Sequence, residues 1–186
     1  MSFIKICSPF DEETISSLKA GDRVLITGVI YTARDAAHKR MYDAIQLGED
    51  LPFNLKGQVI YYVGPTPAKP GQIIGSVGPT TSERMDKYTP ALLEQGLKGM
   101  IGKGYRSKEV VNSIQKNKSL YLAAIGGAGA LIARTVKTVE LIAYEDLGTE
   151  AIRKITVVNF PAVVINDSYG NDWYEEGAKN FNSMEQ

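Results

Sequence analysis

The segment TARDAAHKRM, residues 32–41, contains the only histidine of the chain and directly follows an apolar run. Arg34 and His38 are four residues apart, so a helix would place both on one face at the rim of the core. Cationic side chains beside the free N–H groups of a helix start can bind a carboxylate or a phosphate. The segment therefore indicates an anion site. The alternative is a solvated helix start, in which Arg34 pairs with Asp35 and His38 lies at the surface.

A second polar segment, GPTTSERMD, covers residues 78–86 and places Thr80 and Arg84 four positions apart. One helical turn would bring the hydroxyl and the guanidinium to the same side. A threonine hydroxyl is a poor base unless a local field or a partner lowers its pKa. The alternative is that Thr81 or Ser82 caps a helix while Arg84 is solvated.

A third segment, GKGYRS, covers residues 102–107 and places Lys103 between two glycines. Such a lysine is either a mobile cation over a ligand or an exposed loop residue. The segment lacks the last glycine of the dinucleotide-binding pattern. GGAGA, residues 126–130, lacks the lysine and the spacing of a phosphate-binding loop. Both glycine-rich segments are therefore weak evidence for nucleotide binding.

Each of the three polar segments follows a predicted strand, over residues 23–31, 72–78 and 97–102. Open α/β sheets bind ligands at the carboxyl ends of their strands. Arg34, Arg84 and Lys103 would then surround one crevice, and three cations suit a substrate with two carboxylates. The carboxylates of AYEDLGTEAI, residues 143–152, are expected to be surface or capping residues.

The remaining elements follow from hydrophobic periodicity and from turn residues. We expect helices over residues 11–21, 32–48, 87–96, 107–117 and within 126–136, and strands over residues 58–64, 119–125, 138–144, 155–160 and 161–167. Thr32 and Thr89 are the expected N-caps, and Gly48 is the expected C′ residue. The pattern predicts one α/β domain over residues 1–186, with a mixed sheet covered by helices and a loosely held tail over 171–186.

The composition limits the classes of function. The 21 basic and 21 acidic residues cancel, so no overall field favours nucleic acid or an anionic membrane. Cys7 is the only cysteine, which excludes an internal disulfide and any metal or iron–sulfur site built from several cysteines of this chain. MSFIKICSPF has no apolar run of the secretory type, and the uncharged stretch 119–133 is too short to span a bilayer. A cytoplasmic location is expected.

Three ordered segments carry a family resemblance: GVIYTARDAAHKRM, VGPTTSERMDKYTPALLEQGLKGMIGKG and AYEDLGTEAI. From about residue 5 to residue 174, the chain resembles the β-type half of the iron–sulfur hydro-lyases, which are the class I fumarate hydratases and the L(+)-tartrate dehydratases. The resemblance implies a swivelling β/β/α domain that closes the substrate site. It also implies an α-type part that binds a [4Fe–4S] cluster through three cysteines. The length and the single cysteine fit a separate β subunit, so the cluster is expected on a partner α subunit in a hetero-oligomer, with no metal on this chain.

The resemblance also assigns roles to individual residues. Arg34 and Arg84 match the arginines that bind the substrate carboxylates. Lys103 and Thr81 are implied as further substrate contacts. Thr80 takes the place of the threonine that serves as the catalytic base.

His38 also matches a family motif, and the resemblance implies a catalytic role in which it orients Arg34 or Thr80. The implied reaction is the reversible hydration of fumarate to L-malate, a step of the tricarboxylic acid cycle. In the malate direction a base removes the C3 proton while an open iron acts as a Lewis acid on the C2 hydroxyl. One alternative is the dehydration of L(+)-tartrate to oxaloacetate. Another is a non-catalytic module that binds a small dicarboxylate.

Overall fold

One mixed sheet forms the centre of the computed structural model, which describes residues 2–124 and 129–182. Within these residues the sheet has seven strands, which are β1 (Ile4–Ser8), β2 (Arg23–Thr32), β3 (Val59–Tyr61), β4 (Gly99–Gly102), β5 (Leu120–Ala124), β6 (Val136–Ala143) and β7 (Ile152–Asn166). The α-helices are α1 (Glu12–Ser17), α2 (Asp35–Leu47), α3 (Thr89–Glu94), α4 (Lys108–Lys116), α5 (Gly129–Ala133) and α6 (Trp173–Asn182). Two 3-10 helices are η1 (Ser82–Met85) and η2 (Glu145–Glu150).

The strand pairings close into a ring. β1 lies parallel to β2, and β2, β3, β4 and β5 are parallel neighbours in that order. The long strand β7 runs antiparallel to β2 and also to β5 and β6. The predicted α/β fold with a mixed sheet is therefore confirmed. Because β2, β3 and β4 are parallel, their carboxyl ends lie at the same end of the ring.

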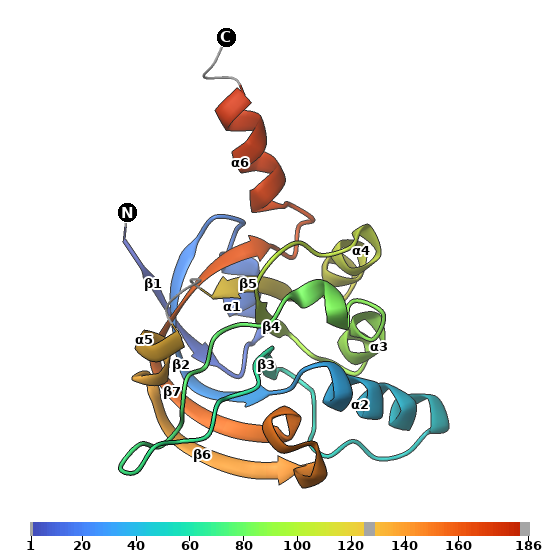
Figure 1. Cartoon of the computed structure of the whole chain (residues 1–186). Helices are drawn as coiled ribbons and strands as arrows, with labels where there is room; N and C mark the ends of the chain where they lie inside the picture. The colour runs from blue at the N-terminus through green and yellow to red at the C-terminus, as the bar shows by residue number, and fades with distance from the viewer. Residues whose placement is uncertain (1, 125–128, 183–186) are drawn as a thin grey trace.

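Two hydrophobic clusters occupy opposite faces of the sheet. Successive residues of β3 alternate between them, since Tyr61 belongs to one cluster and Ile60 to the other. The second cluster also contains Met41 of α2, Leu92 of α3 and Val110 of α4. These three helices lie together on one side of the sheet, whereas α6, which forms most of the polar tail, projects away from the body (Figure 1).

No strand forms over residues 72–78, contrary to the prediction. Ile74 and Val77 are buried, so the apolar pattern reflects loop packing rather than strand pairing. The loop folds back on itself, because the Thr66 N–H donates to the Ser76 carbonyl at 3.1 Å and the Ser76 N–H donates to Thr66 Oγ1 at 2.8 Å. These contacts replace the partners that a strand would find in the sheet.

The two late strands expected on either side of Pro161 form a single strand, β7. Pro161 lies within it, opposite Leu25 of β2. The strand accommodates the proline because Asn159 adopts a positive φ of 55° and the register against β2 shifts between Ile26 and Gly28. A proline is tolerated beside such an irregularity, where the regular ladder of hydrogen bonds is already interrupted.

Helix α2 begins later than predicted. Thr32, the expected N-cap, is the last residue of β2, and its Oγ1 accepts a hydrogen bond from the Arg153 N–H at 3.3 Å. Pairing with β7 therefore keeps Thr32 in the strand. Arg34 is the N-cap, and Asp35 is the first helical residue. Gly48 follows the last helical residue in the left-handed conformation, with φ of 69°, as predicted.

Smaller differences concern the ends of other elements. β1 was not predicted, and α1 ends at Ser17 because the buried Leu18 is extended. Tyr88 rather than Thr89 is the N-cap of α3, since the Thr89 hydroxyl donates to the Met85 carbonyl at 2.9 Å. The helix predicted within 126–136 is observed as α5, while residues 125–128 lie outside the described residues.

The end of β4 requires glycine at position 102. A Cβ added there would lie 2.0 Å from Ser82 Oγ and 2.9 Å from a ring carbon of Tyr62. We expect Gly102→Ala to lower the free energy of unfolding by about 1–3 kcal/mol, because the buried neighbours cannot move aside without strain. Urea unfolding measures the change. Gly78→Ala is the matched control, since a Cβ at Gly78 meets nothing within 4 Å, and equal stability of the two variants would contradict the packing argument.

Candidate active site

Two arginines meet at one carboxylate at the start of α2. Arg84 Nε lies 2.6 Å from Asp35 Oδ1, and Arg34 Nε lies 3.3 Å from Asp35 Oδ2. Partial burial raises the pKa of Asp35, but its backbone hydrogen bond, a hydrogen bond from Arg34 and the charges of both arginines outweigh burial and lower this pKa below its usual value. The carboxylate is therefore ionised at neutral pH. The predicted proximity of Arg34 and Arg84 is observed, and so is the pairing of Arg34 with Asp35.

Glu150 completes the start of α2 from a distant part of the chain. Its Oε2 accepts a hydrogen bond from the Ala36 N–H at 3.0 Å, and its Oε1 lies 3.4 Å from Arg34 Nε. The side chain thus satisfies one of the free N–H groups of the helix start and pairs with a cation at the same time. The expectation that AYEDLGTEAI contributes capping carboxylates is confirmed for this residue.

The backbone places Thr80 and Thr81 beside Lys103. The Thr80 N–H donates to the Tyr62 carbonyl at 2.7 Å, and the Lys103 N–H donates to the Thr80 carbonyl at 3.3 Å. The Ser82 N–H then donates to the Lys103 carbonyl at 2.9 Å, and Thr81 and Lys103 form a parallel bridge. This segment extends the sheet at the carboxyl end of β4. Lys103 and Thr81 are exposed, whereas Thr80 is half-buried.

His38 lies in the interior rather than at the rim of the core. Its side chain is fully buried, and its ring meets the ring of Tyr62 edge-on at 5.1 Å between centroids. Nδ1 lies 3.0 Å from the Arg34 carbonyl oxygen, so Nδ1 carries the proton and donates. Among the described residues, Nε2 has no hydrogen-bond partner. The histidine therefore touches the main chain of Arg34.

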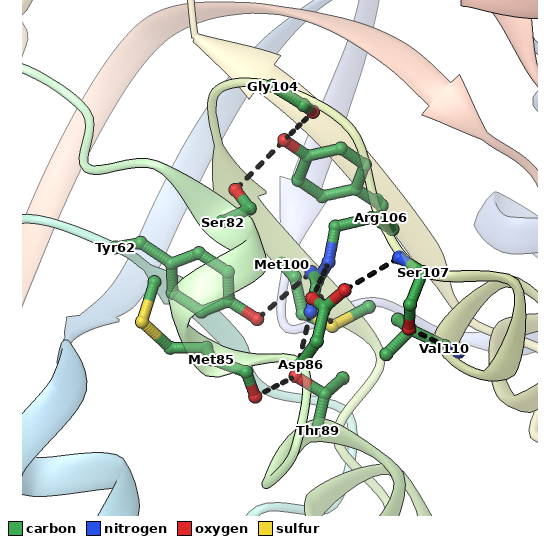
Figure 2. A network of polar contacts seen from close by, with 11 residues as sticks. Tyr62, Ser82, Met85, Asp86, Thr89, Met100, Gly104, Arg106, Ser107 and Val110 are labelled. Atoms are coloured by element: carbon green, nitrogen blue, oxygen red, sulfur yellow. Dashed lines mark hydrogen bonds and ion pairs between the residues drawn. The ribbon is translucent and has the colours of Figure 1, made fainter.

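Sequence reasoning missed a buried ion pair between Arg106 and Asp86, which Figure 2 shows at the centre of a polar network. Arg106 Nε donates to Asp86 Oδ1 at 2.7 Å, and Nη2 donates to Thr89 Oγ1 at 2.7 Å. Nη1 donates to the Tyr62 hydroxyl at 3.3 Å. The other Asp86 oxygen accepts the Ser107 N–H at 2.6 Å. GKGYRS had suggested a loop cation at Lys103, and no local signal distinguishes its arginine as a buried one.

A second branch of this network fixes the glycine-rich loop (Figure 2). The Tyr121 hydroxyl donates to the Gly104 carbonyl at 2.8 Å. Because that uses its only proton, the Ser82 hydroxyl donates to the Tyr121 oxygen at 2.9 Å. The loop that carries Lys103 and the turn that carries Arg84 are therefore fastened to the same buried residues.

The assembled residues can bind an anion. The two guanidiniums meet at the start of α2, just past β2, and Lys103 pairs with Thr81 just past the carboxyl end of β4, so these cationic residues follow parallel strands at the same end of the ring. Residues 2–124 and 129–182 contain no cluster of three or more His, Cys, Asp or Glu side chains that could hold a metal ion. In the same residues, no helix has the length and apolarity needed to cross a membrane.

Burial of His38 makes stability depend on pH. Burial lowers the pKa of His38 to about 4, and the charge of Arg106 acts in the same direction. In the unfolded chain the pKa is near its ordinary value, so between about pH 6.5 and pH 4 the unfolded state binds a proton that the folded state does not. The free energy of unfolding should therefore fall as the pH falls through this window, by up to about 3 kcal/mol.

His38→Asn tests this prediction, because asparagine keeps a donor for the Arg34 carbonyl but does not titrate. Urea unfolding at pH 7.5 and pH 5 should show a smaller loss of stability for the variant than for the parent chain. No other histidine is present to mask the difference. Equal losses in the two proteins would show that His38 is not the titrating group.

The chain matches the family model described as the fumarase C-terminus over residues 2–177. It is 40% identical over 164 residues to the anaerobic class I fumarate hydratase of Escherichia coli K12, a match that covers 87% of this chain and 30% of that protein. It is 38% identical over 172 residues to fumarate hydratase 2 of Leishmania major, covering 90% of this chain and 30% of that protein. The chain thus spans about 30% of the length of these fumarate hydratases.

A Methanocaldococcus jannaschii protein, whose provisional name is L(+)-tartrate dehydratase subunit beta, matches along most of its length. It is 38% identical over 171 residues, which are 89% of this chain and 88% of that protein. The family model covers nearly the whole sequence, and it includes all three segments that build the arginine and threonine site. The chain therefore belongs to the fumarase C-terminus family.

Proposed function

We propose that the chain is the β subunit of a two-subunit hydro-lyase that reversibly hydrates fumarate to L-malate. The observation that carries this proposal is the pair of arginines bridged by Asp35, in a chain of the fumarase C-terminus family. Each arginine can engage a carboxylate with two parallel hydrogen bonds, which suits a substrate with a carboxylate at each end. The proposed setting is a cytoplasmic complex with an α-type partner.

The [4Fe–4S] cluster implied by the family does not fit this chain. Such clusters are held by several thiolates, whereas Cys7 is the only cysteine in the sequence, and it lies exposed in β1. The proposal therefore assigns the cluster to the partner subunit. This chain would contribute the residues that bind the substrate carboxylates and move a proton.

In the malate direction, we assign Thr80 as the base that accepts the C3 proton. A threonine hydroxyl needs help to act as a base. We infer that this help comes from the charges of Arg84, four residues along the chain, and of Lys103, whose N–H donates to the Thr80 carbonyl. Arg34, Arg84 and Lys103 would bind the two carboxylates and stabilise the negative charge that develops when the C3 proton leaves. Each charge-assisted contact is worth about 1.5–3 kcal/mol. Thr81 is assigned as a further substrate contact.

His38 has a supporting role in this proposal. Its buried position leaves no surface for a substrate, and its Nδ1–H is engaged by the Arg34 carbonyl. We therefore assign it the task of holding Arg34 at the N-cap of α2. Proton transfer to or from the substrate is left to Thr80.

The second candidate is the same chemistry on L(+)-tartrate, which yields oxaloacetate. One observation favours it. A relative that is 38% identical over 171 residues carries the name of a tartrate dehydratase β subunit. The residues that would bind two carboxylates serve either substrate equally, so the geometry of the site does not separate the two candidates.

Replacing the proposed base should affect turnover rather than binding. Thr80→Ala, measured in the complex with the α-type partner, should lower kcat by at least about 100-fold, the usual contribution of a positioned base, while KM changes little. Thr80→Ser keeps the hydroxyl and should recover most of kcat. Thr138→Ala, an exposed threonine of β6, is the control. Near-normal turnover by Thr80→Ala would remove Thr80 from the mechanism.

The two-subunit proposal has its own test. The chain is co-expressed with the α-type subunit from its own genome and reconstituted without oxygen, and fumarate and tartrate turnover are followed side by side. The complex should be active and the isolated chain inactive. Activity of the isolated chain would overturn the two-subunit proposal. No activity of a cluster-loaded complex on either substrate would favour a non-catalytic dicarboxylate-binding module.

A further inference from the structure

Asp35 contacts the Nε atom of each of the two arginines that the proposed function assigns to substrate binding. Its Oδ1 lies 2.6 Å from Arg84 Nε and its Oδ2 lies 3.3 Å from Arg34 Nε, so one carboxylate joins two guanidiniums. The arginines come from different elements, since Arg34 is the N-cap of α2 and Arg84 belongs to η1. Asp35 is therefore a direct side-chain link between the two elements.

The guanidinium atoms that Asp35 leaves unused are those that bind carboxylates side by side. In the part of the chain that the structure describes, no hydrogen bond is donated by an Nη atom of Arg34 or Arg84. Each guanidinium has five donors, and its two Nη groups can form a fork that matches a carboxylate. Asp35 thus holds each arginine by its Nε and leaves the fork for a ligand.

The contact with Asp35 matters more for the position of Arg84 than for that of Arg34. Its side chain is 54% exposed, whereas the side chains of Arg34 and Asp35 are 23% and 26% exposed. Arg34 is also held by Glu150, whose Oε1 lies 3.4 Å from Arg34 Nε. A long exposed side chain without a fixed partner samples many rotamers, and a ligand that binds it must order it.

We propose that Asp35 is a positioning residue that fixes Arg34 and Arg84 relative to each other, so that their free Nη groups receive the carboxylates of one dicarboxylate substrate. This inference rests on the proposed function, because it names the substrate as a dicarboxylate. It assigns Asp35 no contact with the reacting atoms. Asp35 lowers the free-energy cost of ordering the Arg84 side chain when substrate binds.

Charge alone predicts the opposite effect, which makes the inference testable. Asp35 is ionised, so Asp35→Asn leaves the site one unit more positive without changing the size of the side chain. If Asp35 acted only through its charge, this variant would bind a dianionic substrate more tightly. If Asp35 positions the arginines, the variant binds the substrate more weakly, because the link between the two guanidiniums is lost.

The experiment compares KM and kcat in the reconstituted complex. We expect Asp35→Asn to raise KM for the turned-over dicarboxylate about tenfold while kcat changes less than about twofold. Both arginines are retained in this variant and, once bound substrate has ordered them, they stabilise the developing charge as in the parent. Asp43→Asn is the matched control, because Asp43 lies on the same helix and pairs with Lys39 instead of an arginine. An unchanged or lower KM for Asp35→Asn would overturn the inference.

A second substitution and a double-mutant cycle exclude a merely structural effect. Asp35→Glu keeps the charge but lengthens the side chain, so it should also raise KM. It replaces Asp35→Asn in the test if that variant does not assemble with the partner. In an Arg84→Lys background, Asp35→Asn should add little, because lysine has no Nε to be held. Additive effects of the two substitutions would show that Asp35 does not act through Arg84.

Calorimetric binding of succinate, an unreactive dicarboxylate, separates this inference from the proposed function. If the complex turns over neither fumarate nor tartrate, the proposed function fails, but succinate binding still decides the role of Asp35. Tighter binding by the parent complex than by Asp35→Asn, by about tenfold, supports positioning. Equal binding by the two complexes, or no binding by either, overturns it.

Discussion

Arg106 and Asp86 form an ion pair with almost no contact with water, and two of the three segments that carry the candidate site are built around it. Removing one partner of such a pair leaves a buried charge without compensation, which costs about 3–5 kcal/mol. Asp86 also accepts the Ser107 N–H, and Arg106 also donates to Thr89 and Tyr62. The turn that carries Arg84 and the loop that carries Lys103 therefore have fixed relative positions before any ligand arrives, and a ligand does not have to order them.

The charges around the arginines balance more closely than the number of cations suggests. Arg34, Arg84 and Lys103 supply three positive charges, and Asp35 and Glu150 supply two negative ones, which leaves one net positive charge. Under the proposed function, a bound dicarboxylate would leave the assembly with one negative charge, which the proposed partner subunit would have to balance. The proposed selectivity for a dicarboxylate would therefore depend on where the guanidiniums are held more than on the total charge of the surface.

Local sequence patterns predicted the elements whose ends are set by short-range chemistry. Gly48 terminates α2 because only glycine adopts the left-handed conformation freely, and α4 begins as expected because Ser107 caps it. The failures have a common cause in long-range contacts. Pairing with β7 kept Thr32 in its strand, and an inward-folded loop gave residues 72–78 the apolar pattern of a strand. The segments of Arg34, Thr80, Arg84 and Lys103 were predicted to meet because each follows a predicted strand, and pairing of Arg34 with Asp35 was foreseen as an alternative. The second contact of Asp35, with Arg84, and the burial of Arg106 became visible only in three dimensions.

The start of α2 is completed by a residue 114 positions further along the chain, because Glu150 binds the Ala36 N–H. β7, which pairs with β2 along its length and joins it to β5, also follows Glu150. A growing chain on the ribosome that has not yet reached this point contains Arg34, Thr80, Arg84 and Lys103 but lacks the carboxylate and the strand that hold them. The site is therefore assembled only after Glu150 and β7 have emerged and the ring has closed.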